Sequence, residues 1–172
     1  MPYFSKRLVL LLALAGTMPA ASAASAIASA GETKITFIEP ENFTDARLGR
    51  ASGGADAIVL ATLERHLQQL ASRCLPAGRS LDIRIHDIDL AGRVEWWHGS
   101  SGQTRVMNDV TWPRIKLTYA VQEDGQTGRD TLHELSNMAY LSESPFLRAE
   151  SMPLPYERSM LGQWFEQQFC NK

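Results

Sequence analysis

The sequence predicts an α+β fold, a two-layer sandwich in which a mostly antiparallel sheet carries two helices on one face. Two segments, 56–75 and 156–169, repeat apolar residues at helical spacing and keep polar residues on the opposite side. Together with the predicted strands they give the order β-α-β-β-β-α, which is typical of helices packed on one side of an antiparallel sheet. Alternation of apolar and polar residues predicts strands at 33–38, 80–90, 114–121 and 128–135.

The N-terminal segment 1–23 has the pattern of an export signal peptide. Lys6 and Arg7 precede an apolar run that is too short to span a bilayer as a stable helix. The Ala-Ser-Ala triplets at 21–23 and 28–30 follow, and they predict cleavage after Ala23 or after Ala30. We therefore expect a periplasmic protein with no transmembrane span after cleavage. Because no cysteine lies beside either site, we expect no lipid anchor.

The rest of the chain is expected to contain a disordered tail at 24–32 and one domain at 33–172. Hydrophobic residues make up 44% of the sequence, which is enough for a core. The formal net charge is −2, and loss of the two cations in 1–23 makes it −4. Binding to nucleic acid relies on a basic excess, so we expect no nucleic-acid partner.

The two cysteines, Cys74 and Cys170, each lie near the C-terminal end of a predicted helix. Export would place them in an oxidising compartment, where a disulfide is possible. The alternative is that both are small buried hydrophobic residues. Neither cysteine has another cysteine or a histidine at zinc-ligand spacing, so a zinc site is not expected.

The central predicted strand changes its phase near His86. Its apolar residues occupy first odd and then even positions: Leu81, Ile83, Ile85, Ile88 and Leu90. A straight strand would place Asp87 and Asp89 on the core face, where burial of two unpaired carboxylates costs far too much free energy. We therefore predict a β-bulge near His86 and Asp87 that turns both aspartates outward.

The segment 91–113 is long for a connection, and it holds Trp96, Trp97 and Trp112. A long loop with so much apolar area is expected to fold back and pack, with a short strand at 105–107. Trp96 and Trp97 could stack on a sugar, a peptide or an aromatic ligand, or they could cap the open face of the sheet. Neighbouring residues on an extended chain point to opposite sides, so we expect one of the pair to be exposed.

His86, Asp87 and Asp89 are the best candidates for acid/base or metal chemistry. The alternative is that the aspartates are solvated at a strand end, one of them paired with Arg93 or Arg114. The sequence lacks common hydrolase and nucleotide-binding signatures, including G-x-S-x-G, S-x-x-K, H-E-x-x-H and the P-loop. We therefore predict no catalytic residue, no bound metal and no cofactor.

Several longer stretches resemble one family. They include TKITFIEPENFTD, HDIDLAGRVEWW, RVMNDVTWPRIKLTY, LSNMAYL and LPYERSMLGQWFEQQF, in this order between residues 34 and 169. These stretches are similar to a family of secreted bacterial proteins known as domain of unknown function 3016. The resemblance implies secretion and a single domain. It implies no catalytic residue, because the family has no established activity.

Taken together, these patterns favour a periplasmic, non-catalytic binding or envelope-interaction module. Its expected partner is an envelope protein, a glycan or a peptide. The alternative hypothesis is a small hydrolase or metal-dependent enzyme that uses His86, Asp87 and Asp89. The predicted binding residues are Asp87, Asp89, Arg93, Trp96, Trp97 and Trp112.

Overall fold

The computed structural model describes the chain at 32–49, 54–95, 104–123, 125–142 and 152–170. The predicted signal peptide at 1–23 and almost all of the predicted tail lie outside the described residues. The strands are β1 (Thr33–Phe37), β2 (Arg79–Asp89), β3 (Arg93–Val94), β4 (Arg105–Val106), β5 (Arg114–Glu123), β6 (Gln126–Thr127) and β7 (Thr131–Ser136). The helical elements are η1 (Pro40–Asn42), α1 (Ala57–Cys74), α3 (Pro155–Phe165) and η2 (Glu166–Cys170).

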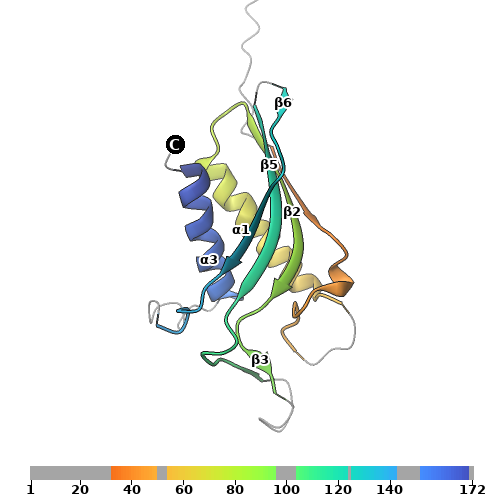
Figure 1. Ribbon diagram of the computed structural model, residues 1–172, viewed down its shortest axis with the longest axis vertical. Helices are drawn as coiled ribbons and strands as arrows, with labels where there is room; N and C mark the ends of the chain where they lie inside the picture. The colour runs from red at the N-terminus through yellow and green to blue at the C-terminus, as the bar shows by residue number, and fades with distance from the viewer. Residues whose placement is uncertain (1–31, 50–53, 96–103, 124, 143–151, 171–172) are drawn as a thin grey trace, which may run out of the picture.

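Most of the strands form one mixed sheet, which is mainly antiparallel. β1 pairs with β2 in parallel, whereas β2 with β5, β5 with β6 and β5 with β7 are antiparallel pairs. β3 and β4 form a separate antiparallel pair beyond one end of the sheet. Figure 1 shows α1 and α3 side by side on one face of the sheet. The predicted α+β fold with two helices is therefore confirmed.

β2 contains the bulge that the apolar pattern predicts. The pairing of β2 with β5 keeps one register from Arg79 to Ile85, and the register then shifts between Ile85 and Asp87. Ile88 is fully buried, His86 is exposed, and Asp87 and Asp89 are half-buried. Both aspartates stay out of the hydrophobic core, because the extra residue restores the apolar side chains to the helix-covered face.

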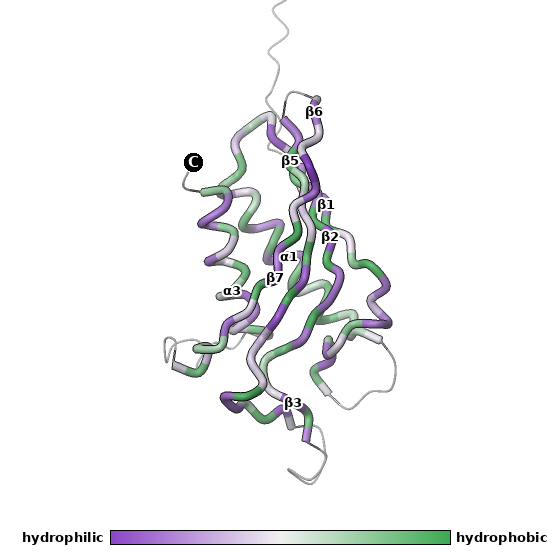
Figure 2. The backbone as a smooth tube through the Cα atoms, in the orientation of Figure 1, coloured by the Kyte–Doolittle hydropathy of each residue, from purple (hydrophilic) through white to green (hydrophobic). Residues whose placement is uncertain are grey.

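The core lies between the sheet and the two helices. Ile83 and Ile85 from β2 pack with Leu63 and Leu67 from α1 and with Phe165 from α3, and all five side chains are fully buried. Figure 2 shows hydrophobic and hydrophilic residues alternating along both helices, as expected for elements with one face on a core. Among the described residues, no helix is long and apolar enough to cross a bilayer.

Two local details mark the ends of the helices. Asp56 directly precedes α1, where an aspartate often caps the helix, but its carboxylate makes no such hydrogen bond. Its Oδ2 atom instead accepts a hydrogen bond from the backbone N–H of Leu48 at 2.8 Å, and so holds the preceding loop. The helix predicted at 156–169 begins at Pro155 and is α-helical only to Phe165. A π-helical turn, η2, continues the chain.

A disulfide joins Cys74 at the end of α1 to Cys170 at the end of η2. The two Cα atoms are 4.7 Å apart, although the residues are separated by 96 positions in sequence. The bridge therefore ties together the C-terminal ends of the helical layer. The alternative of two reduced buried cysteines does not hold in this structure.

A tight turn connects β5 to β6. Glu123 pairs with Gln126, which leaves a two-residue turn between the strands. Gly125 has a φ of 77°, a conformation that favours glycine in such turns. Its neighbour Asp124 lies outside the described residues. The strand predicted at 128–135 corresponds to β7, which begins and ends later and pairs with β5.

Candidate functional site

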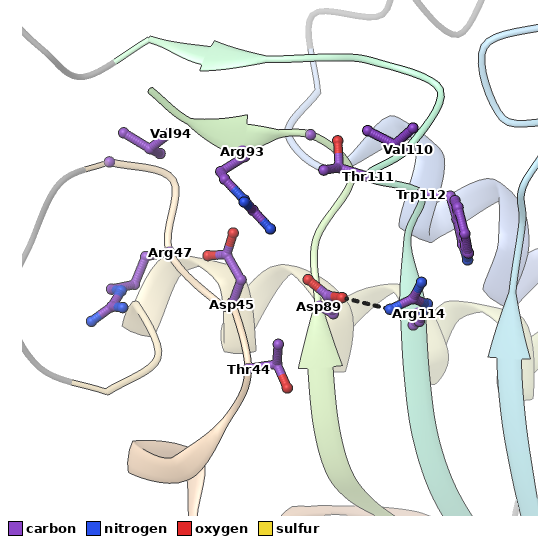
Figure 3. Close-up of a pocket in the computed structure, with 12 residues that line it drawn as sticks. Thr44, Asp45, Arg47, Asp89, Arg93, Val94, Val110, Thr111, Trp112 and Arg114 are labelled. Atoms are coloured by element: carbon purple, nitrogen blue, oxygen red, sulfur yellow. Dashed lines mark hydrogen bonds and ion pairs between the residues drawn. The ribbon is translucent and has the colours of Figure 1, made fainter. Parts of the chain in front are cut away.

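A cavity of about 520 Å³ opens at the end of the sheet where β2 stops and β5 begins (Figure 3). We call it the arginine cleft. Its walls come from the loop after η1, the end of β2, β3 and the segment leading into β5. The lining residues are Thr44, Asp45, Arg47, Gly49, Asp89, Gly92, Arg93, Val94, Val110, Thr111, Trp112 and Arg114.

The loop after η1 reaches the cleft by extending the parallel pairing of β1 with β2. The backbone N–H of Asp45 donates to the carbonyl of Ile88, and the N–H of Leu90 donates to the carbonyl of Asp45, both at 2.9 Å. The carboxylate of Asp87 accepts from the backbone N–H and the hydroxyl of Thr44, both at 2.7 Å. These bonds hold the loop against the end of β2 and bring Asp45 into the cleft.

Arg105, at the start of β4, supports the cleft from within the protein. Its side chain is only 9% exposed. The guanidinium donates to the carbonyls of Ala91, Gly92 and Arg47 and to both carboxylate oxygens of Asp45, the latter at 2.9 and 3.0 Å. Charge-assisted bonds of this kind are about twice as strong as neutral ones. One side chain on β4 therefore joins two separate segments of the cleft wall, 45–47 and 91–92.

Gly92 allows two of these segments to approach each other. Its φ is +75°, and a Cβ atom at this position would lie 2.6 Å from the carbonyl oxygen of Val106. Its backbone N–H also donates to the carbonyl of Thr111 at 2.8 Å. The close contact and the left-handed conformation both require glycine. This residue therefore sets how close β4 and the 110–112 segment lie to the end of β2.

Asp89 and Arg114 form an ion pair across the cleft, with 3.4 Å between Oδ2 and Nη1 (Figure 3). Burial raises the pKa of Asp89 above its ordinary value, and the positive charge of Arg114 opposes this rise. The guanidinium of Arg114 also lies over the ring of Trp112, 4.4 Å from its centroid. Trp112 and Arg114 separate the cleft from a second depression of about 500 Å³, which they also line.

The structure brings together half of the binding residues predicted from the sequence. Three of them line the arginine cleft, namely Asp89, Arg93 and Trp112. Asp87 lines the second depression instead, and its carboxylate is engaged by Thr44. Trp96 and Trp97 lie outside the described residues.

His86, Asp87 and Asp89 do not converge. His86 is exposed, and its Nε2 atom lies 2.9 Å from the hydroxyl of Thr118 on the neighbouring strand. Asp87 and Asp89 line different cavities, and His86 lines neither. The bulge separates the three side chains, so the geometry gives no support to the alternative enzyme hypothesis. Within the described residues, no group of three His, Cys, Asp or Glu side chains could hold a metal ion.

Sequence reasoning missed Asp45, Arg47 and Arg105 as parts of the site. Asp45 and Arg105 are 60 positions apart, and no local pattern connects them. The only available signal was that Arg105 begins the short strand predicted at 105–107. A cation at the start of a strand is common on protein surfaces, so its burial could not be predicted.

Glu157, near the start of α3, is buried beside this framework. It is 2% exposed, and its Oε1 atom accepts from the backbone N–H of Ala91 at 2.7 Å. Burial raises the pKa of Glu157 above its ordinary value of 4.5, while the hydrogen bond from Ala91 and the charge of Arg105 act in the opposite direction. The folded protein therefore holds this proton more tightly than the unfolded chain does.

We expect Glu157→Gln to reduce the loss of stability as the pH rises. The stabilising contribution of the protonated carboxyl is fully present below about pH 4.5, and it is lost as the pH passes through the raised pKa of the folded state. Urea unfolding at a series of pH values measures this for both proteins. The difference between their free energies of unfolding should change across the window. A constant difference would show that Glu157 has the same pKa in both states.

A family model described as "Protein of unknown function (DUF3016)" matches residues 31–167. The chain belongs to this family. The DUF3016 match begins before β1 and ends within η2, so every segment that lines the arginine cleft falls inside it. The resemblance seen in the sequence motifs is thereby confirmed. No curated protein and no solved structure matches the chain.

Proposed function

We propose that this DUF3016 protein is exported to the periplasm and binds a component of the cell envelope in the arginine cleft, without catalysing a reaction. The observation that carries the proposal is the buried Arg105 framework beneath an open, charged cavity. A binding site gains affinity when its walls are held in place before the ligand arrives. Arg105 and Gly92 hold the walls in this way.

The size and lining of the cleft support a binding role. Ligand sites commonly occupy about 300–1,000 Å³, and the arginine cleft falls in this range at about 520 Å³. The arginines offer hydrogen-bond donors, and Trp112 offers an aromatic surface. Shape, charge and aromatic area are therefore combined at one end of the sheet.

The lining residues favour binding over catalysis. Among the described residues of the cleft there is no histidine or cysteine, and its two threonine hydroxyls are already bonded. Thr44 donates to Asp87, and Thr111 donates to the side chain of Asn108 at 2.8 Å. A nucleophile with an adjacent base is the usual requirement of covalent catalysis, and these described residues provide none.

Two observations support export. The pattern of 1–23 is that of a signal peptide. The disulfide between Cys74 and Cys170 is of a kind that forms and persists in oxidising compartments such as the bacterial periplasm. The first observation comes from the sequence and the second from the tertiary structure, so they are independent.

Site-specific crosslinking in intact cells tests this proposal. Val110 lies on the cleft and is 70% exposed, so benzoylphenylalanine at this position would contact a bound partner. We expect illumination to give a discrete adduct with an envelope component, and mass spectrometry identifies it. The captured chain is expected to begin at Ala24 or Gly31, after the predicted cleavage sites.

The matched control places the same group at Ile58. This residue is also apolar and exposed, at 58%, but it lies on α1 and does not line the cleft. We expect little or no adduct from this position. Equal adducts from both positions would show non-specific capture, and no adduct from position 110 would exclude the cleft as the contact surface. Either outcome contradicts the proposed function.

A further inference from the structure

We propose that the arginine cleft recognises a carboxylate or phosphate group on its ligand, which bonds to Arg93 and Arg114 and displaces Asp89 from Arg114. This assignment rests on the proposed function of the cleft as a binding surface, and it adds the chemical class of the ligand.

The charges around the cleft favour an anion. Its lining contributes the guanidiniums of Arg47, Arg93 and Arg114 and the carboxylates of Asp45 and Asp89. Arg105 lies behind this lining, and its guanidinium is paired with Asp45. The lining therefore carries three positive charges and two negative ones, an excess of one, in a cavity where water only partly screens them. The excess is local, because the whole chain has a net charge of −2.

Arg114 is suited to accept a second partner. Its only ion pair among the described residues is the 3.4 Å contact with Asp89, and its side chain is 51% exposed. The contact is long and involves one of its nitrogen atoms, whereas a guanidinium has five N–H donors in a planar fork. The cation–π contact with the ring of Trp112 restrains this guanidinium. A ligand oxyanion could therefore make the two parallel bonds that Asp89 does not make.

Arg93 provides the second contact. It is exposed on β3, and its guanidinium points into the cleft from the side opposite Arg114 (Figure 3). Arg93 and Arg114 therefore approach the same space from two strands, with Asp89 between them. Guanidinium pairs of this kind match the planar carboxylate and the phosphate oxygens better than a single point charge does.

Asp89 is a weak competitor for Arg114. Four charged groups surround it: Arg114 on β5, Arg93 on β3, Asp45 on the loop and Asp87 on its own strand. Burial raises the pKa of Asp89 first, and the two other aspartates add to the rise, while the two arginines oppose it. An anion bound beside Asp89 would raise that pKa further. By linkage, protonation of Asp89 must strengthen the binding of the anion.

The proposal is tested by nuclear magnetic resonance titration of the folded chain. The probes are inorganic phosphate, sodium glucuronate and sodium sulfate, and sodium chloride is the reference salt. We expect the amide signals of 92–94 and 110–114 to shift. Arg93→Gln and Arg114→Gln should each weaken binding about tenfold or more, as for the loss of a charged hydrogen bond. Asp89→Asn should strengthen it several-fold. Sulfate keeps its charge between pH 8 and about 5, so a change in its affinity over this range reports on the protein. Protonation of Asp89 should raise the affinity for sulfate as the pH falls, and this rise should be smaller in Asp89→Asn.

Two variants at an ion pair away from the cleft provide controls. Arg84 and Asp130 form an exposed ion pair at 3.0 Å and line neither the cleft nor the second depression. Arg84→Gln and Asp130→Asn make the same changes in net charge as the cleft variants, and neither should alter the affinity. If Arg84→Gln weakens binding as much as Arg114→Gln does, the anion responds only to net charge. If Asp89→Asn weakens binding, Asp89 is a ligand contact. Both results overturn the proposal.

The choice of anion separates its possible sources. Preference for glucuronate supports a carboxylate, and preference for phosphate supports a phosphoryl group. Failure of this inference also differs from failure of the proposed function. If position 110 captures a specific partner while none of the anions binds in the cleft, the ligand is neutral or cationic. The inference then fails and the binding role remains. If position 110 captures no partner and no anion binds in the cleft, the proposed function and this inference are both rejected.

Discussion

Replacing Arg105 with methionine is expected to lower the free energy of unfolding by about 3–5 kcal/mol. The substitution removes the positive partner of Asp45 and leaves three backbone carbonyls without their donor, in a place where the side chain is 9% exposed. Breaking one side of a buried pair costs more than the pair contributes, because the remaining charge stays uncompensated. Urea denaturation followed by circular dichroism measures the change.

Arg84→Met is the matched control for this prediction. Arg84 also bonds two aspartates, Asp82 at 3.1 Å and Asp130 at 3.0 Å, but its side chain is 38% exposed, against 9% for Arg105. Exposed ion pairs contribute little, so its unfolding midpoint should hardly change. A second variant, in which Asp45→Asn is combined with Arg105→Met, should recover part of the lost stability. Equal midpoints for Arg105→Met and Arg84→Met would show that Arg105 has no structural role.

Removing the disulfide with the paired changes Cys74→Ala and Cys170→Ala is expected to cost about 4–5 kcal/mol. In the chain-entropy model, a bridge stabilises the fold by restricting the unfolded chain, and a loop of about 100 residues gives this value. The 96-residue separation of the two cysteines is close to that length. Thermal and urea unfolding of the oxidised protein and of the double variant measure the difference.

Reduction provides the control for the disulfide. A reducing agent should bring the unfolding midpoint of the original protein close to that of the double variant, and it should leave the double variant unchanged. Because the bridge joins the ends of α1 and η2 and not the strands, the signals of the arginine cleft should persist in the folded double variant. An original protein whose midpoint is unaffected by reduction would contradict the prediction.

Much of the architecture could be predicted from local patterns. The helical spacing around Leu63 and Leu67 and the strand alternation around Ile83 specify which faces are buried, because period and burial are linked along a single element. The bulge at His86 followed in the same way, since two carboxylates could not be placed in the core. Each of these conclusions depends on residues that are close in sequence.

The arginine cleft could be predicted only in part. Asp89 stands out in the sequence at the end of the central strand, Arg93 directly after it and Trp112 by its residue type. Nothing local indicated that Asp45 lies beside them, because the loop after η1 reaches β2 through a parallel pairing between distant segments. The alternative hypothesis of a site formed by His86, Asp87 and Asp89 finds no support for a related reason. The bulge directs their side chains to different partners.

The class of the fold, the buried faces of its elements and the position of the bulge all follow from local sequence patterns, because burial of apolar groups and exclusion of unpaired charges act within each segment. The tertiary structure alone decided which arginine is buried and which ones face the cavity. That distinction depends on acceptors from two distant segments, 45–47 and 91–92, that meet around Arg105, and such long-range contacts leave no period in the chain. The disulfide also depends on the tertiary structure, because it can form only where two helix ends meet.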